Sequence, residues 1–276
     1  MLLAFLVNMI KLIVCDCDGT LLNSKKKVDE GIGQLMPELE KRGIILTIAT
    51  GRNEELVDHY IDEIGIKAPY ITDNGATIHR LHQLEKIYEI PREYNKTIID
   101  ILLELDVPFV YFAKERSLLY RNSDFFAKRL KPFFDRKLID VFGKDTDVTN
   151  DHVFKITMDF KSLSPSVRSE TVDKVKKLCP LVNFGPGEGD VYSLNFIKAG
   201  KGNALREIMA MLGIRKEEVI AFGDNFNDLP LLKEAGKAIV MANAEEDLKA
   251  LGYEICGDND HLGVSTYLKE MLGIKL

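Results

Sequence analysis

Short runs of apolar residues recur along the chain, and each is followed by a segment with helical periodicity. The first run, Ile10 to Cys15, precedes a polar segment and a predicted helix from about Val28 to Arg42. Gly43 is typical of a helix end, and the second run, Ile44 to Ala49, is apolar enough for a strand buried on both faces. This order of strand and helix predicts a parallel sheet covered by helices.

The same pattern continues after the second run and returns in the last third of the chain. We expect Asn53 to cap a helix that ends near Ile64, followed by a short strand at Tyr70-Ile71. Later, a helix from about Gly202 to Leu212 precedes the apolar strand Val219 to Phe222. A polar loop, a helix to Ala235 and another strand follow.

The middle third has a different pattern, with short alternating runs and separate helices. The glycine-rich stretch Gly185 to Gly189 opens no clear helix, so we predict a loop at the end of this region. The sequence therefore predicts a doubly wound, Rossmann-like parallel-sheet core of residues 1–82 and 190–276, with an α/β domain of residues 83–189 inserted into it.

Composition is that of an ordinary globular protein. The chain has 276 residues, of which 46% are hydrophobic and 29% charged, enough for a sizeable core. Its formal net charge of −6 has the wrong sign for attraction to nucleic acid or to an anionic membrane. We expect neither as a partner, and the sequence carries no signal for an oligomeric state.

Neither the cysteines nor the start of the chain indicates export. The four cysteines form no C-x-x-C pair, which disfavours disulfides and structural zinc and is typical of a cytoplasmic protein. The apolar start lacks a basic region and is interrupted by Asn8 and Lys11, well short of the roughly 20 apolar residues of a membrane span. Met9 is a possible alternative start.

Candidate chemistry lies just after three of the predicted strands. Asp16 and Asp18 follow the first, Thr50-Gly51 follows the second, and Gly223-Asp224 follows the strand Val219 to Phe222. Ligands of open α/β sheets bind at this edge. Residues two apart on a strand point the same way, with Cα atoms roughly 6 to 7 Å apart. Two carboxylates so placed repel unless a cation lies between them, and Mg²⁺ suits a site with few carboxylates.

Paired carboxylates can transfer a phosphoryl group. One attacks phosphorus, while the other protonates the leaving oxygen and then activates water. The Thr50 hydroxyl and the Gly51 backbone N–H, close to a helix start, suit a phosphate anion. Lys201, which opens a predicted helix, supplies a positive charge.

Four motifs, in this order, resemble those of the haloacid dehalogenase superfamily of phosphatases. They are Asp16-Cys-Asp-Gly-Thr-Leu-Leu22, Thr50-Gly-Arg52, Lys201-Gly-Asn-Ala-Leu205 and Gly223-Asp-Asn-Phe-Asn-Asp228. The large insertion, with Asp73-Asn-Gly-Ala76 before it, is similar to the Cof-type branch, whose inserted cap covers the active site and selects the substrate. The resemblance implies a Mg²⁺-dependent phosphatase of small phosphorylated metabolites, usually sugar phosphates, with cap hinges near residues 82 and 190.

The resemblance also implies a role for each matching residue. Asp16 becomes the nucleophile and a metal ligand, and Asp18 becomes the general acid/base, with its backbone carbonyl on the metal. Asp224 completes the protein's metal ligands, and Asn227 and Asp228 support phosphate and metal. The remaining predicted phosphate-binding residues are Cys17, through its backbone N–H, Thr50, Gly51, Arg52 and Lys201.

Other readings of the same residues stay open. A phosphomutase or other phosphotransferase would share the two aspartates, and a non-catalytic protein that binds phosphorylated metabolites could keep the same site. A dehalogenase is disfavoured because its chemistry does not need Asp18. Asn74-Gly75 is a turn that could place Asn74 toward substrate, and Lys25 to Lys27 is interpreted as a solvated loop.

Overall fold

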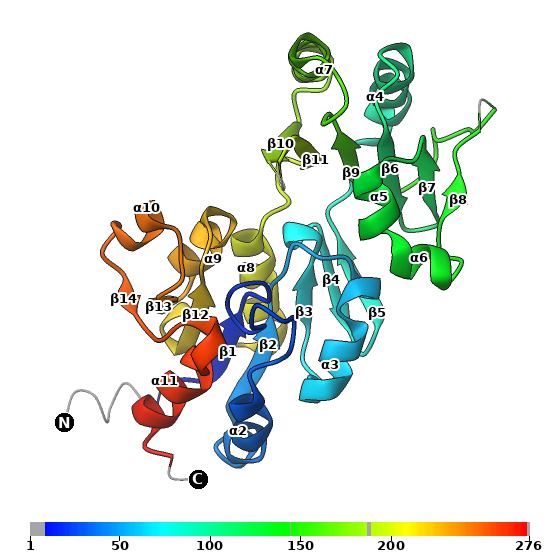
Figure 1. Cartoon of the computed structure of the whole chain (residues 1–276). Helices are drawn as coiled ribbons and strands as arrows, with labels where there is room; N and C mark the ends of the chain where they lie inside the picture. Colours follow the sequence, from blue (N-terminus) through cyan, green and yellow to red (C-terminus); the bar gives the residue numbers. More distant parts are fainter. Residues whose placement is uncertain (1–8, 144, 187–188, 275–276) are drawn as a thin grey trace. The chain divides into compact units, whose positions relative to one another are not determined.

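The computed structural model describes residues 9–143, 145–186 and 189–274, which form two compact units (Figure 1). One unit comprises residues up to 86 together with those from 200 onward, and the other spans Ile87–Ala199. These limits differ from the predicted boundaries at 82/83 and 189/190. The strand β5 (Gln83–Ile87) joins a sheet of the first unit, and β11 (Val191–Phe196) pairs within the sheet of the second.

A five-stranded parallel sheet is the centre of the first unit, which confirms the predicted α/β fold. Its order is β14-β13-β12-β1-β2, and each neighbouring pair is parallel. The bounds are β1 (Leu12–Cys15), β2 (Ile45–Ile48), β12 (Val219–Gly223), β13 (Lys237–Val240) and β14 (Glu254–Ile255). Because all five run the same way, the residues that follow them meet at one edge.

Helices cover both faces of this sheet. One face is covered by α2 (Glu30–Lys41), α3 (Asp58–Ile64) and α11 (Gly263–Leu272), and the other by α8 (Lys201–Leu212), α9 (Leu229–Glu234) and α10 (Glu246–Lys249). Short 3₁₀ helices connect these elements: η1 (Glu54–Leu56), η2 (Asp73–Gly75), η3 (Lys216–Glu218), η4 (Phe226–Asp228) and η5 (Asn259–His261).

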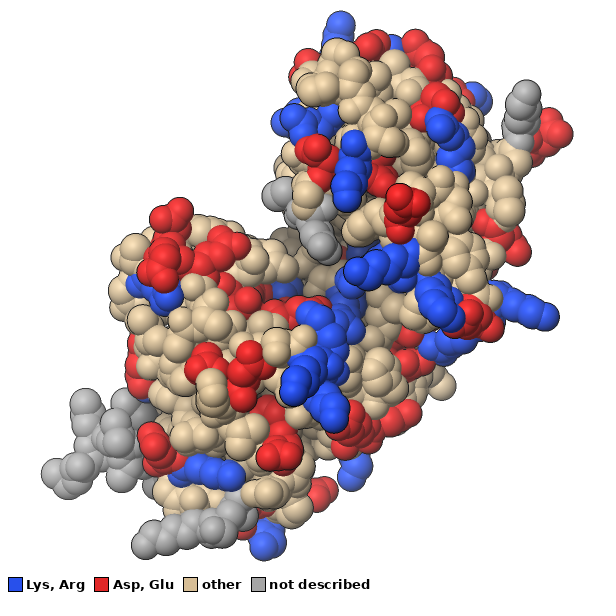
Figure 2. All heavy atoms as spheres, in the orientation of Figure 1, with Lys and Arg blue, Asp and Glu red and all other residues tan. Residues whose placement is uncertain are grey.

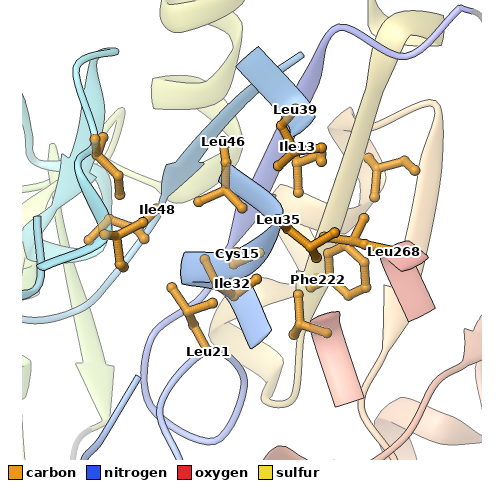
Figure 3. Packing of buried hydrophobic residues seen from close by; sticks show 14 of the residues in the cluster. Ile13, Cys15, Leu21, Ile32, Leu35, Leu39, Leu46, Ile48, Phe222 and Leu268 are labelled. Carbon is orange, nitrogen blue, oxygen red and sulfur yellow. The ribbon is translucent and has the colours of Figure 1, made fainter. Parts of the chain in front are cut away.

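The side chains of β1 alternate between two hydrophobic clusters, one on each face of the sheet. Ile13 and Cys15 join the cluster under α2, α3 and α11, while Leu12 and Val14 join the cluster under α8, α9 and α10. Successive side chains of a strand point to opposite faces, so a run with no polar residue buries both. Figure 3 shows Ile13 and Cys15 packed among residues of α2, β2 and β12, with Leu268 of α11 beside them.

Two predictions for this unit are wrong in detail. The predicted helix from Asn53 to Ile64 is broken into η1 and α3, because Val57 has φ −127° and ψ −10°. Asn53 makes no capping hydrogen bond, since its side-chain amide donates to Asp73 Oδ1 at 2.6 Å.

The strand predicted at Tyr70-Ile71 lies outside the five-stranded sheet. It is β3 (Tyr70–Thr72), which pairs antiparallel with β4 (Thr77–Arg80) in a three-stranded sheet completed by β5. A single bridge from Ile71 to Ala49 connects β3 to the end of β2.

The second unit is built on a six-stranded sheet of order β10-β11-β9-β6-β7-β8, antiparallel except for the pair β7-β8. Besides β11, its strands are β6 (Phe109–Ala113), β7 (Ser117–Tyr120), β8 (Asp140–Val141), β9 (Val153–Asp159) and β10 (Val182–Pro186). Its helices are α4 (Arg92–Glu104), α5 (Asp124–Arg129), α6 (Lys131–Asp135) and α7 (Pro165–Leu178). Residues of α4 and α7 pack on one face of the sheet in a separate hydrophobic cluster.

Sequence reasoning missed two strands here. Gly185 and Pro186, predicted as part of a loop, end the edge strand β10, and the following strand β11 was assigned to the core. A proline lacks the N–H that a central strand would need, but an edge strand tolerates it. The rest of the predicted loop, Gly187 and Glu188, lies outside the described residues.

On the face shown in Figure 2, acidic and basic side chains are interspersed over both units. All four cysteines are free thiols. Among the described residues, no helix is both long and apolar enough to cross a membrane.

Candidate active site

Three carboxylates meet at the carboxyl edge of the parallel sheet. Asp16 directly follows β1, Asp224 directly follows β12, and Asp228 ends η4. Each offers one oxygen, and these oxygens all lie within 4.8 Å of one another. The parallel register brings the first two together, because Cys15 pairs with Phe222 and the Asp16 N–H donates to the Phe222 carbonyl at 3.0 Å.

Lys201, the first residue of α8, supplies the buried cation of this cluster. Its ammonium donates to Asp16 Oδ1 at 2.6 Å and to Asp228 Oδ1 at 2.5 Å, and its side chain has no exposed surface. Three carboxylates and one ammonium sum to −3 + 1 = −2. The cluster therefore has the charge and the oxygen ligands that one divalent cation would neutralise.

Burial and the repulsion between the carboxylates raise the pKa values of Asp16 and Asp224. Burial raises the pKa of Asp16 well above its usual range, and the charge of Asp228 adds to this effect. Burial and Asp228 likewise raise the pKa of Asp224 to about 6. For Lys201, burial alone would lower the pKa, but the two facing carboxylates raise it above its ordinary value, so the lysine remains charged.

Two backbone features orient Asp224 and Asp228. Gly19 has φ +84°, and a Cβ there would lie 2.3 Å from Asp224 Oδ2, so only glycine fits. The neighbouring Thr20 hydroxyl donates to Asp224 Oδ1 at 2.8 Å. The backbone N–H groups of Asp224 and Asn225 both donate to Asp228 Oδ2, at 3.1 Å each. Sequence reasoning gave Gly19 and Thr20 no role, although both belong to the first motif.

The carboxylate of Asp18 lies outside this cluster and is held by two cations. Arg52 donates through Nε to Oδ2 and through Nη2 to Oδ1, both at 2.6 Å, and Lys26 Nζ donates to Oδ1 at 2.6 Å. Burial alone would raise the pKa of Asp18, but these contacts bring it well below its ordinary value. The predicted metal contact of Asp18 is through its backbone carbonyl. The position of the side chain does not test this contact, which stays a prediction.

Arg52 and Lys26 thus share a contact with Asp18 that the sequence did not indicate. The guanidinium of Arg52, predicted to bind phosphate, pairs with Asp18. Lys25 to Lys27 are exposed, as expected of a solvated loop, but the sequence did not indicate that the Lys26 ammonium reaches the same carboxylate. A run of three lysines carries no sequence signal that would single out the middle one.

Thr50 and Gly51 lie beside the cluster at the end of β2. Thr50 is buried, its N–H donates to the Ile71 carbonyl at 2.9 Å, and its hydroxyl accepts the Arg52 N–H at 3.2 Å. A Cβ at Gly51 would lie 2.9 Å from Asn74 Oδ1. Asn74, in the left-handed region at φ 56°, also accepts from the exposed Asn227 amide at 3.1 Å. The Asn74 backbone N–H donates to the Thr50 carbonyl at 2.9 Å, so Asn74 joins the second motif to the fourth.

All ten predicted site residues belong to the first unit, and Cys17 is the deepest of those that follow β1. Its side chain is 1% exposed, and its carbonyl accepts from the Leu22 N–H at 2.8 Å. The site as a whole is an acidic edge with a buried lysine, on a parallel sheet whose unit is interrupted by an α/β unit, and such an edge suits a hydrolase of phosphoric monoesters. The family model for haloacid dehalogenase-like hydrolases matches residues 13–268, and the chain belongs to this family.

Named proteins with similar sequences are phosphatases by name. The putative phosphatase YxeH of Bacillus subtilis (strain 168) is 31% identical, over 96% of this chain and 99% of that protein. The phosphoglycolate phosphatase of Methanopyrus kandleri is 28% identical, over 96% of this chain and 98% of that protein. Among solved structures, the haloacid dehalogenase subclass IIB sugar phosphatase BT4131 superposes with a TM-score of 0.78 at 22% identity, covering 94% of this chain and 98% of that one. This last likeness supports the fold alone.

Proposed function

We propose that this phosphatase is Mg²⁺-dependent, acts on small phosphorylated metabolites, above all sugar phosphates, and proceeds through a phosphoaspartate on Asp16. One observation carries the proposal: Asp16 lies in a buried acidic cluster of net charge −2, with one of its oxygens held by Lys201. A carboxylate fixed in this way is arranged for attack on phosphorus once a divalent cation offsets the negative charge of the cluster.

The donors present fit Mg²⁺, which prefers oxygen ligands and retains several waters. Asp16 and Asp224 would hold it, together with the Asp18 carbonyl, and Asp228 would support them from the other side of Lys201. When bound, the ion supplies positive charge to the transferring phosphoryl oxygens. The residues themselves provide carboxylate oxygens, and burial followed by the charge of Asp228 raises the pKa values of Asp16 and Asp224.

In the first step, a carboxylate oxygen of Asp16 forms a bond to phosphorus and the bond to the ester oxygen breaks. This step needs Asp18 in its protonated form, against the lowering of its pKa by Arg52 and Lys26, and the proton of Asp18 goes to the leaving alkoxide. In the second step, Asp18 takes a proton from water while that water's oxygen attacks phosphorus, which releases phosphate and restores the Asp16 carboxylate.

The phosphoryl group would be held by donors that converge on this edge. We assign this role to the ammonium of Lys201, the hydroxyl of Thr50, the backbone N–H groups of Cys17 and Gly51, and the amide of Asn227. Arg52 would act from its place beside Asp18. Fixed donors aimed at developing charge are the largest contribution in most phosphoryl and acyl transfers.

Substrate choice is assigned to the inserted unit, in accordance with the Cof-type resemblance. The assignment to sugar phosphates has the same basis. Both are tested by a panel of phosphate esters, in which sugar phosphates are expected to have the highest kcat/KM.

The test of the function is phosphate release from p-nitrophenyl phosphate and from the sugar phosphate panel, with and without Mg²⁺. Release should need Mg²⁺ and should be lost in Asp16→Asn. The matched control is Asp100→Asn, an exposed aspartate of α4 that pairs with Lys96 on the surface; it should retain full activity. Phosphate release that survives Asp16→Asn would show that Asp16 is not the nucleophile.

A further inference from the structure

Asp18 has little room to act as a proton donor while Lys26 and Arg52 hold it. A carboxylate offers about four lone-pair sites. Oδ1 accepts from both Arg52 Nη2 and Lys26 Nζ, and Oδ2 accepts from Arg52 Nε. These three donors leave one site, on Oδ2. That one site can take the transferred proton, and the departure of a cation would free a further site on Asp18.

The two cations are not equally free to leave. The Arg52 side chain is 11% exposed, binds Asp18 with two nitrogens and lies over the Tyr60 ring at 5.6 Å. The Lys26 side chain is 56% exposed and makes a single contact with Asp18. An exposed ion pair of this kind adds little stability, so an incoming anion can displace it. Lys26 is therefore the cation that exchanges.

The loop that carries Lys26 is built to present it. The side chain of Asn23 accepts from the N–H groups of both Lys25 and Lys27, at 3.0 Å each. The Tyr60 hydroxyl donates to the Lys26 carbonyl at 2.8 Å, and Lys26 itself is in the left-handed region at φ 58°. These bonds fix the backbone on both sides, so only the side chain is free to change partner.

Charge identifies the new partner as an anion. Asp18 with Arg52 and Lys26 sums to −1 + 2 = +1, next to a cluster of net charge −2 that would hold a divalent cation. We propose that Lys26 is a substrate-binding residue, which exchanges Asp18 for an oxygen of the incoming phosphoryl group and so leaves Asp18 paired with Arg52 alone. This inference rests on the proposed function, because it takes the phosphoryl group to bind at this edge.

Binding of inorganic phosphate in the presence of Mg²⁺, measured by isothermal titration calorimetry, tests the exchange without turnover. Lys26→Met loses one charge-assisted hydrogen bond to phosphate, so its Kd should be about tenfold higher than that of the wild type. In the wild type, breaking the exposed ion pair between Lys26 and Asp18 costs little of this gain in affinity. Lys26→Arg should restore most of the affinity. Lys25→Met removes the same charge from the next position of the loop and should change the Kd less than about twofold.

Steady-state kinetics on p-nitrophenyl phosphate then separates substrate binding from mere positioning of Asp18. If Lys26 binds the substrate, Lys26→Met should raise KM about tenfold and leave kcat within about threefold of the wild-type value. A lowered kcat with an unchanged phosphate Kd would overturn the inference, as would equal effects of Lys26→Met and Lys25→Met. If the wild type binds phosphate but releases none from any ester, the proposed function fails, and the Kd comparison still decides the role of Lys26.

Discussion

At the scale of single residues, Lys201 explains how three carboxylates can share one buried edge. A fully buried lysine is costly unless it is paired, and here two carboxylates face it at hydrogen-bond distance. The same pairing directs one oxygen of Asp16 toward the lysine. Lys201 thus stabilises the cluster and orients the proposed nucleophile.

Replacing Lys201 with Met should destabilise the protein, because Asp16 and Asp228 would remain buried without their cation. The expected loss is about 3 to 5 kcal/mol in the presence of EDTA, and added Mg²⁺ should restore part of it. Urea unfolding monitored by circular dichroism measures both values. The exposed Lys67, whose ion pair spans 3.7 Å, is the matched control, and Lys67→Met should cost less than about 1 kcal/mol. Equal stability of the two variants would contradict the account.

Gly19→Ala tests the close approach beside Asp224. The added Cβ would displace Asp224 Oδ2, so a higher Mg²⁺ concentration should be needed for half-maximal activity, by about tenfold or more. The control is Gly33→Ala in α2, where an added Cβ would meet no described atom within 4 Å beyond its chain neighbours and its own helix backbone. Alanine there should stabilise the helix by about 0.5 to 1 kcal/mol and leave the Mg²⁺ requirement unchanged. An unchanged requirement in Gly19→Ala would show that Asp224 does not bind the metal.

At this scale the sequence predicted which residues belong to the site, but it did not predict which side chains contact one another. Asp16 and Asp224 could be placed together because both follow strands of a parallel sheet. The pairing of Asp18 with Lys26 depends on a loop conformation at φ 58°, for which the sequence contains no glycine as a signal. Distances between side chains of separate loops are decided by packing, which a single sequence does not reveal.

At the scale of elements, the hairpin β4-β5 is fastened to η1 and α3 by one histidine. His82, in the turn of the hairpin, places Nδ1 2.7 Å from Glu54 Oε1 and Nε2 2.9 Å from Asp62 Oδ1. Hydrogen bonds to Asp62 and Glu54 raise the pKa of His82 above its ordinary value of 6.5. Both ring nitrogens can donate only when the imidazole is protonated.

This contact should make stability depend on pH. Because the folded-state pKa is raised, the stabilisation is fully present below the ordinary value of 6.5 and is lost as pH rises through the raised pKa. His82→Asn, chosen because asparagine tolerates the left-handed backbone, should lower the melting temperature at about pH 5.5 and change it little at about pH 9. The exposed His59 of α3 is the control. An equal effect of His82→Asn at both pH values would contradict the charged contact.

Elements were predictable where burial on both faces left a continuous apolar run. Val219 to Phe222 is such a run, and it is β12. Asn53 was wrongly predicted to cap a helix, because an asparagine before a helical pattern is typical of a cap. In the structure its side-chain amide donates to Asp73. In the second unit, β10 was missed because a glycine and a proline end it, and both residues are otherwise typical of loops.

At the scale of the whole molecule, the chain folds around separate cores. The first unit has clusters on both faces of its parallel sheet, and the second has its own cluster under α4 and α7. No described residue belongs to clusters of both units. The change of pattern predicts the inserted domain but not its limits, because only the pairing partners of β5 and β11 assign these two strands to a unit.

Separate cores predict two unfolding transitions by scanning calorimetry. Mg²⁺ should raise only the transition of the unit that contains Asp16. Ile156→Ala, in the core of the second unit, should cost about 2 to 5 kcal/mol in the other transition and leave the shift by Mg²⁺ unchanged. A single transition that responds to both changes would contradict independent cores.

The central claim is that Asp16 carries the phosphoryl group during turnover. The most direct measurement is rapid mixing of the protein with Mg²⁺ and p-nitrophenyl phosphate, quenching in acid, and mass spectrometry of the peptide that contains Asp16. The account predicts one added phosphoryl group on Asp16, absent without Mg²⁺ and absent in Asp16→Asn. Turnover with no phosphorylated peptide, or with the phosphoryl group on another residue, would contradict it.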